Sequence, residues 1–195
     1  AVYDLSQGMA RQMSGSILGQ QIDGIWHTGI VCWRKEYFFG GGVQMLPEGG
    51  FSRNCGLHPV QMLSLGRTNK TQTELENWLP TISHRYTQAT YDLIRHNCNN
   101  FSEEVSRYLL DGVGIPRHII DLPNIVFSTP LGAMLRPMVE SLQSGMNGMG
   151  GSVGSLDPFA AGRRVSSLYD EDIARRQQQQ QQQRGRPESE TPPPL

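Results

Sequence analysis

The sequence predicts an α+β domain, with strands concentrated in the first third of the chain and helices after them. Three observations support this prediction. β-Branched and aromatic residues crowd residues 25–33, a helix start with an apolar stripe follows Thr71, and a second apolar stripe follows Cys98. Residues 1–143 are enough to bury one hydrophobic core.

The N-terminal part of the chain is expected to supply the strands and one short helix. Residues 25–33 lie between the turn-forming pairs 23–24 and 34–35, and residues 36–39 follow closely enough to be a hairpin partner. Residues 2–5 and 60–65 have similar composition and are also expected as strands. A short helix is expected over residues 9–18.

Three helices are expected in the second half of the domain. Thr71 and Glu74 match the capping-box pattern, in which each side chain satisfies a backbone donor of the other residue, and apolar residues at helical spacing follow them. A second helix carries the apolar stripe of residues 101–109. A third is expected over residues 123–141, interrupted or kinked at its two internal prolines.

The composition changes at residue 144. Glycine, serine and methionine dominate first, seven glutamines occupy residues 177–183, and a proline-rich end follows. Such a segment cannot bury enough apolar surface to offset the entropy cost of ordering it. Residues 144–195 are therefore predicted to be a disordered low-complexity tail, and residues 1–143 to be the folded domain.

Charge and cysteine content exclude several classes of function. Lysine and arginine total 17 against 18 acidic residues, and this balance argues against a nucleic-acid-binding protein. The sequence contains no run of about 20 apolar residues, which is the length needed to cross a bilayer. Cys32, Cys55 and Cys98 are odd in number and form no Cys-x-x-Cys pair, so neither a disulfide framework nor a zinc or redox site is expected, and a reducing compartment fits best. No metal and no cofactor are expected.

Cys98 is the candidate nucleophile. It stands in the first turn of an expected helix, where the helix dipole and unsatisfied N–H groups stabilise a thiolate and lower its pKa. The same N–H groups could bind the oxyanion of a tetrahedral intermediate. A buried structural cysteine is the competing interpretation, and the pattern alone leaves the two about even.

His27 is the candidate base. It lies inside an expected strand, where alternation places it on one face with apolar neighbours, either as a satisfied core histidine or as a base held rigidly beside Cys98. His96 could only line or cap the site. The remaining histidines, His58, His84 and His118, are expected in loops or on the surface.

These residues belong to blocks that resemble the PPPDE cysteine peptidase family, which includes desumoylating members. The resemblance covers residues 2–142 and holds in order and spacing. The blocks are Val2-Tyr3-Asp4-Leu5-Ser6, Gly24-Ile25-Trp26-His27-Thr28, Glu36-Tyr37-Phe38-Phe39-Gly40, His96-Asn97-Cys98-Asn99 and Asp121-Leu122-Pro123.

The resemblance implies a permuted papain-like fold with a catalytic dyad of His27 and Cys98, and no third catalytic residue. It implies removal of SUMO from substrate lysines, a homodimer with the active site in a groove between subunits, and a location in the cytoplasm and nucleus. Substrate-binding residues are also expected. Those that could wall a groove for a Gly-Gly terminus are Trp26, Gly40, Gly41 and Gly42, and those beside the nucleophile are Asn97 and Asn99.

Two alternatives stay open at this point. A deubiquitinase or a protein S-depalmitoylase would use the same dyad, because all these reactions pass through an acyl-cysteine. A non-catalytic tag-binding or nuclear-export adaptor would carry Cys98 only incidentally.

Overall fold

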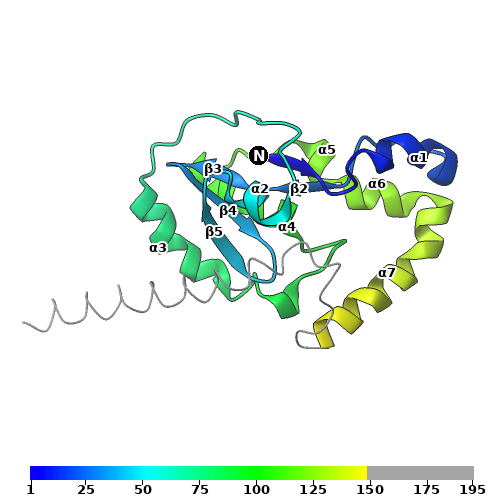
Figure 1. Cartoon of the computed structure of the whole chain (residues 1–195). Coiled ribbons are helices and arrows are strands. Elements are labelled where there is room, and N and C mark those ends of the chain that lie inside the picture. The colour runs from blue at the N-terminus through cyan, green and yellow to red at the C-terminus, as the bar shows by residue number, and fades with distance from the viewer. Residues whose placement is uncertain (149–195) are drawn as a thin grey trace, which may run out of the picture.

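The computed structural model of the chain describes residues 1–148, which fold into two small antiparallel sheets packed with helices (Figure 1). One sheet pairs β1 (Val2–Asp4) with β2 (Trp26–Thr28). The other has the order β3 (Ile30–Cys32), β4 (Lys35–Phe39) and β5 (Val43–Pro47). The predicted α+β class is confirmed.

The single strand expected over residues 25–33 is divided into β2 and β3 at Gly29. β2 pairs only with β1, whereas β3 pairs with β4. A Cβ on Gly29 would lie 2.6 Å from a carboxylate oxygen of Glu36, so only glycine allows the backbone to pass this close to β4. The chain can therefore change sheets at this residue.

The hairpin of β3 and β4 turns on two residues, Trp33 and Arg34, with φ angles of 48° and 59°. A type I′ hairpin turn has left-handed backbone at both positions, which asparagine and glycine usually supply. β5, which was not predicted, follows the glycine turn of residues 40–42 and pairs with all of β4. The strand predicted over residues 60–65 is wrong, because this segment forms a single bridge, between Gln61 and Val2.

Several helices begin and end as predicted. α1 (Met9–Leu18) and α4 (Cys98–Leu109) match, and α3 (Gln72–Ser83) begins with both hydrogen bonds of the predicted capping box. Two short helices were not predicted, α2 (Gly50–Cys55) and α5 (Arg117–Ile120).

The third predicted helix is broken at one of its prolines and continues through the other. α6 (Leu122–Ser128) ends before Thr129, whose hydroxyl accepts the Gly132 N–H at 3.0 Å and so caps α7 (Pro130–Gly148). Proline suits the first turn of a helix, where its missing N–H has no partner to lose. α7 runs past the predicted domain boundary at residue 143, and the rest of the predicted tail lies outside the described residues.

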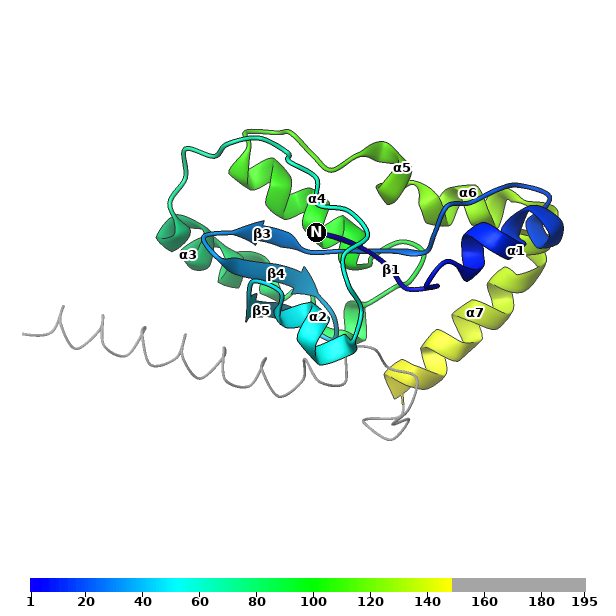
Figure 2. The same cartoon turned by 45° about the horizontal axis from the view of Figure 1, so that its top comes forward.

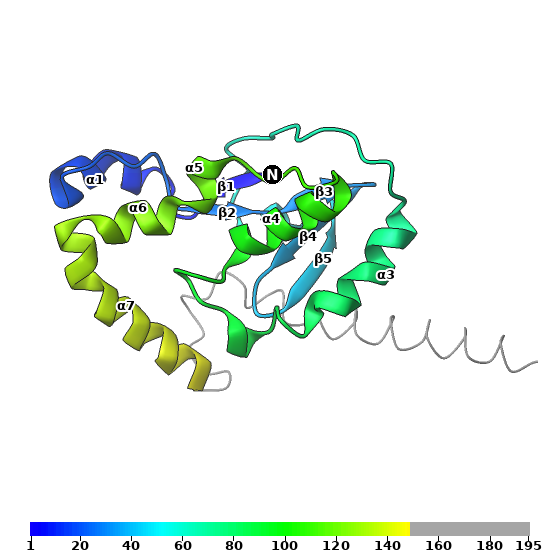
Figure 3. The same cartoon turned by 180° about the vertical axis from the view of Figure 1, so that it is seen from behind.

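α4 packs against one face of the three-stranded sheet, and it lies in front of that sheet when the molecule is seen from behind (Figure 3). With α3 it encloses the main core cluster, which includes Tyr37, Phe39, Leu75, Leu79, Phe101 and Val105. The other face of β4 contributes Phe38 to a second cluster, with Tyr3, Leu46 and Phe51. α1, α6 and α7 lie together to one side of both sheets (Figure 2).

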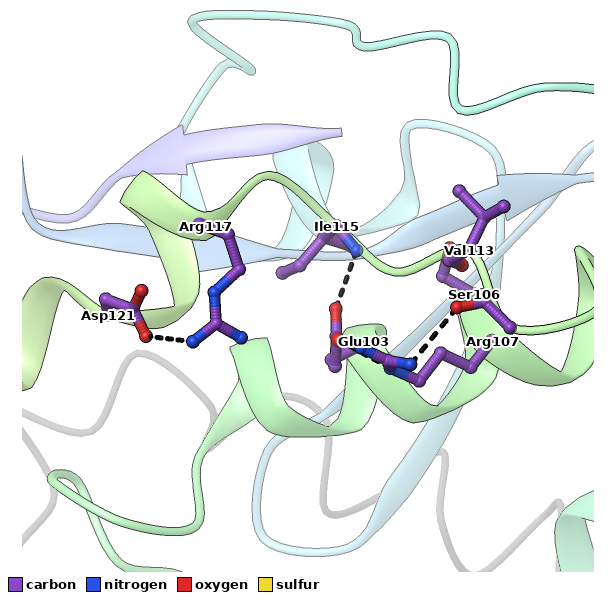
Figure 4. A network of polar contacts seen from close by, with 8 residues as sticks. Glu103, Ser106, Arg107, Val113, Ile115, Arg117 and Asp121 are labelled. Carbon is purple, nitrogen blue, oxygen red and sulfur yellow. Dashed lines mark hydrogen bonds and ion pairs between the residues drawn. The ribbon is translucent and has the colours of Figure 1, made fainter.

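A network of polar contacts fixes α4 to the segment that leads into α5 (Figure 4). The Glu103 carboxylate accepts the Ile115 N–H at 2.7 Å and the Arg107 Nε–H at 2.6 Å. The Ser106 hydroxyl donates to the Val113 carbonyl at 2.8 Å. A Cβ on Gly114 would collide with the Glu103 carboxylate, so glycine is needed for this close approach.

We expect Gly114→Ala to lower the free energy of unfolding by about 1–3 kcal/mol, because Glu103 must move and leave the Ile115 N–H without its acceptor. Urea denaturation of the full chain measures this. In a Glu103→Ala background the same substitution should cost much less, since no carboxylate is left to displace. Equal costs in the two backgrounds would contradict the role assigned to this network.

Candidate active site

The first turn of α4 is organised by Asn97, the residue that caps it. Its side-chain oxygen accepts the N–H groups of Asn99 at 2.9 Å and Asn100 at 3.4 Å. The Asn100 side chain accepts the Asn97 N–H at 2.9 Å in return, which completes a capping box. Cys98 is the first residue of the helix, so its predicted position in the first turn is confirmed.

α4 is fastened to the edge of β2 that does not pair with β1. The Asn99 side chain donates to the Trp26 carbonyl at 3.1 Å and accepts the Thr28 hydroxyl at 2.9 Å. The Ser102 hydroxyl donates to the Thr28 carbonyl at 3.2 Å. These polar side chains occupy the positions that a neighbouring strand would otherwise take, and they satisfy buried backbone groups.

His27 points away from this edge into the second core cluster. Its ring stacks on Phe51, with 4.3 Å between centroids and 15° between planes, and it meets the edge of Phe38 at 5.6 Å. The side chain is fully buried, and burial lowers the pKa of His27 to about 3. The imidazole is therefore neutral at physiological pH, as a general base must be before it accepts a proton.

The Cys98 thiol is also buried, with 3% of the residue exposed. Burial raises the pKa of Cys98 to about 11, although hydrogen bonds from the Thr28 amide and the Tyr91 hydroxyl favour the thiolate. The predicted lowering of this pKa is thus wrong. The helix terminus contributes as expected, but the loss of solvent is the larger effect.

Cys98 and His27 lie on adjoining elements, the start of α4 and the strand β2. The amide that bonds the sulfur belongs to Thr28, the residue directly after His27. The sulfur lies at the edge of β2, while the imidazole lies on the face of the strand that packs on Phe51. The structure places the two predicted residues on adjoining elements as a neutral thiol, which donates to the Asn99 side-chain oxygen at 3.7 Å, and a neutral imidazole. Their action as a catalytic dyad stays a prediction.

The predicted substrate-binding residues fall into two groups. The Asn97 and Asn99 side chains are committed to internal hydrogen bonds with α4 and β2, and Trp26 packs on a cluster that includes Ile119. The turn of residues 40–42 lies beside the segment that leads to the site, because Gly42 pairs with Thr87. Contact of these residues with substrate stays a prediction.

Two features near the dyad were missed in the sequence. The Tyr3 hydroxyl donates to the fully buried Glu36 carboxylate at 2.8 Å, and Tyr3 is the cross-strand partner of His27. Burial raises the pKa of Glu36. The other missed residue is Tyr91, the donor to Cys98. The available signals were a glutamate directly before the aromatic run Tyr37-Phe38-Phe39 and an aromatic residue shortly before Cys98.

Other groups in the described structure do not extend the site. His96 keeps its Nδ1 3.0 Å from the Thr90 carbonyl, with its ring stacked on Tyr86. Across residues 1–148, no group of three or more His, Cys, Asp or Glu side chains is placed to hold a metal ion. In the same region, no helix combines the length and apolarity that a membrane span requires.

Comparison with known proteins identifies relatives of most of the chain. The family model described as "PPPDE putative peptidase domain" matches residues 1–140. Desumoylating isopeptidase 1 of Homo sapiens is 43% identical over 155 residues, which cover 78% of this chain and 89% of that protein. The Xenopus laevis protein of the same name is 40% identical over 145 residues, covering 73% and 83%. A Caenorhabditis elegans homolog is 28% identical over 114 residues, covering 55% and 34%.

The buried neutral His27 should make the fold sensitive to acid. Its pKa is about 6.5 when unfolded and about 3 when folded, so the unfolded chain binds the proton first and stability falls as the pH drops below 6.5. Between pH 7 and pH 5 we expect wild type to lose about 2 kcal/mol more unfolding free energy than His27→Phe. Urea denaturation at both pH values measures this, and parallel losses would refute the assigned pKa.

The buried thiol should react slowly in the folded protein. With the pKa of Cys98 near 11, iodoacetamide at pH 7 should modify it roughly 10²-fold more slowly than in the urea-unfolded chain. Mass spectrometry of the peptide that contains Cys98 follows the reaction. Rapid modification of the folded protein at pH 7 would instead indicate a preformed thiolate.

Proposed function

The chain belongs to the PPPDE peptidase family, and we propose that it is a cysteine isopeptidase that releases SUMO from the lysine side chains of conjugated proteins. The observation that carries this proposal is the packing of the start of α4, which contains Cys98, on the edge of β2, which contains His27. The strand with the histidine precedes the helix with the cysteine in the chain, which is the order of a permuted papain-like fold. The relatives named desumoylating isopeptidase 1 support SUMO as the tag.

The proposed acyl transfer starts from a neutral Cys98 thiol and a neutral His27 imidazole. As the Cys98 thiol attacks the carbonyl carbon of the terminal glycine, its proton passes to His27, and the carbonyl oxygen takes the negative charge. The imidazolium then protonates the lysine amine as the carbon–nitrogen bond breaks. This leaves a thioester on Cys98, which water hydrolyses with His27 again as base.

The surroundings of His27 suit the charge that it acquires during this step. Phe51 presents a ring face at 4.3 Å, and Phe38 and Tyr3 border the same imidazole. Aromatic faces attract a cation, so these rings offset part of the cost of charging a buried histidine. The dyad can therefore stay neutral at rest and become charged only while substrate is bound.

The homodimer and the distribution between cytoplasm and nucleus are further proposals, both drawn from the family resemblance. Light scattering of the purified full-length chain tests the dimer. Imaging of a tagged chain in cells tests the distribution.

The proposed activity is tested by fluorophore release from the C-terminal amide of SUMO. Wild type should release the fluorophore, and Cys98→Ser and His27→Ala should each lower kcat/KM by at least about 10³-fold, because each removes one partner of the acyl transfer. Thermal melting of all three proteins controls for folding.

The corresponding ubiquitin amide and a palmitoyl-cysteine thioester serve as comparison substrates in the same assay. Release from one of these alone would replace SUMO as the substrate while keeping the dyad. A folded wild-type protein that acts on none of the three substrates would contradict the proposal.

A further inference from the structure

The oxyanion of the proposed reaction needs hydrogen-bond donors, and the start of α4 supplies fewer than its sequence suggests. The N–H groups of Asn97, Asn99 and Asn100 already donate within the capping box. Among the first-turn amides of α4, only the Cys98 N–H lies outside that box, and it faces its own sulfur, as the Asn99 N–H also does. The expected set of helix N–H donors is thus reduced to one, and a second donor has to come from another segment.

Tyr91 is placed beside Cys98 by the loop that joins them. Asp92 and His96 exchange two backbone hydrogen bonds of 2.8 Å, which close the loop and set Tyr91 opposite Asn97. The Asn97 side chain also donates to the Leu93 carbonyl at 2.9 Å and so ties the loop to the helix cap. The Tyr91 ring packs against Phe39 with 5.0 Å between centroids.

From this position the Tyr91 hydroxyl bonds the Cys98 sulfur. The Thr28 amide bonds the same atom, but Thr28 is buried in the strand edge, whereas Tyr91 is partly exposed. The Asn99 side chain is committed at both ends to β2. Tyr91 is therefore the donor next to the sulfur that a substrate arriving from solvent can meet.

We propose that Tyr91 is a further catalytic residue, whose hydroxyl donates a hydrogen bond to the substrate carbonyl oxygen as that oxygen becomes an oxyanion. This inference rests on the proposed isopeptidase function. It assigns the second oxyanion donor to a side chain outside α4, with the Cys98 N–H as the first.

The step requires only a change of acceptor. When the sulfur–carbon bond forms, the electron pair of the carbonyl π bond moves to oxygen, and the thiol proton goes to His27. The sulfur is then a neutral thioether and a weak acceptor, so the Tyr91 hydroxyl turns to the neighbouring oxyanion, where its bond is stronger. When the carbon–nitrogen bond breaks, the oxygen returns its electron pair and Tyr91 keeps its proton throughout.

Tyr91→Phe tests this role, because it removes the hydroxyl and keeps the ring that packs on Phe39. With the SUMO amide substrate, kcat should fall by about 10²- to 10³-fold while KM stays close to the wild-type value. Tyr108→Phe is the matched control. The Tyr108 hydroxyl donates to the Glu74 carbonyl at 3.3 Å and its ring stacks on Trp78, away from Cys98, so its kinetics should equal those of wild type.

A SUMO chain that ends in a glycine aldehyde provides a second readout. The aldehyde forms a hemithioacetal with Cys98, and its oxygen occupies the place of the oxyanion. Tyr91→Phe should weaken inhibition by a factor similar to its loss of kcat, with an unchanged melting temperature. Equal kcat and equal inhibition for Tyr91→Phe and Tyr108→Phe would overturn the inference.

Alkylation of Cys98 by iodoacetamide, measured across a range of pH, distinguishes a Tyr91 hydroxyl that bonds the sulfur from a Tyr91 ring that only covers it. Loss of the donor should raise the apparent pKa of Cys98, so Tyr91→Phe should react more slowly than wild type at each pH below that pKa. Faster alkylation with unchanged kcat would show that Tyr91 only covers the thiol, and would overturn the inference. If wild type releases no SUMO, the result counts against the proposed function. The alkylation measurement does not depend on that activity, so an unchanged alkylation profile in Tyr91→Phe would by itself refute the hydrogen bond from Tyr91 to the sulfur.

Discussion

The hydrogen bonds between the start of α4 and the outer edge of β2 determine where the reactive groups lie. Asn99 and Ser102 satisfy the Trp26 and Thr28 backbone groups, so the helix stands where another strand would pair. Side chains alternate along a strand, and a shift of one residue would therefore exchange His27 for a neighbour that faces the opposite side. A structural requirement, satisfying a buried strand edge, thus fixes the register of Cys98 against the strand that contains His27.

Burial serves the fold and restrains the chemistry at the same site. The aromatic cluster around His27 contributes to the core, and the same enclosure lowers the pKa of His27 and raises that of Cys98. Separating charge between a buried thiol and a buried imidazole costs solvation that only a nearby developing charge or dipole can replace. In the proposed reaction, proton transfer is therefore coupled to substrate attack.

The sequence predicted those parts of the site that depend on local patterns. The cap at Thr71, the helix that begins at Cys98 and the strand that contains His27 all follow from spacing and residue type. Division of one strand at Gly29 could not be predicted, because it depends on Glu36 approaching from another strand. The pKa of Cys98 was wrong for a related reason: a helix terminus can be read from sequence, whereas burial by distant segments cannot.

The capping box explains why the cysteine motif does not define the oxyanion site by itself. A helix start has a limited number of N–H groups, and Asn97 and Asn100 use three of them to stabilise α4. Each N–H held by the cap supports the helix and is lost as an oxyanion donor. The donors at the sulfur are the Cys98 and Asn99 N–H groups of α4, the Thr28 amide of β2 and the hydroxyl of Tyr91, which precedes the loop closed by Asp92 and His96. The oxyanion site is therefore a property of three segments that meet only in the folded chain, and its geometry depends on tertiary structure more than on the dipole of one helix.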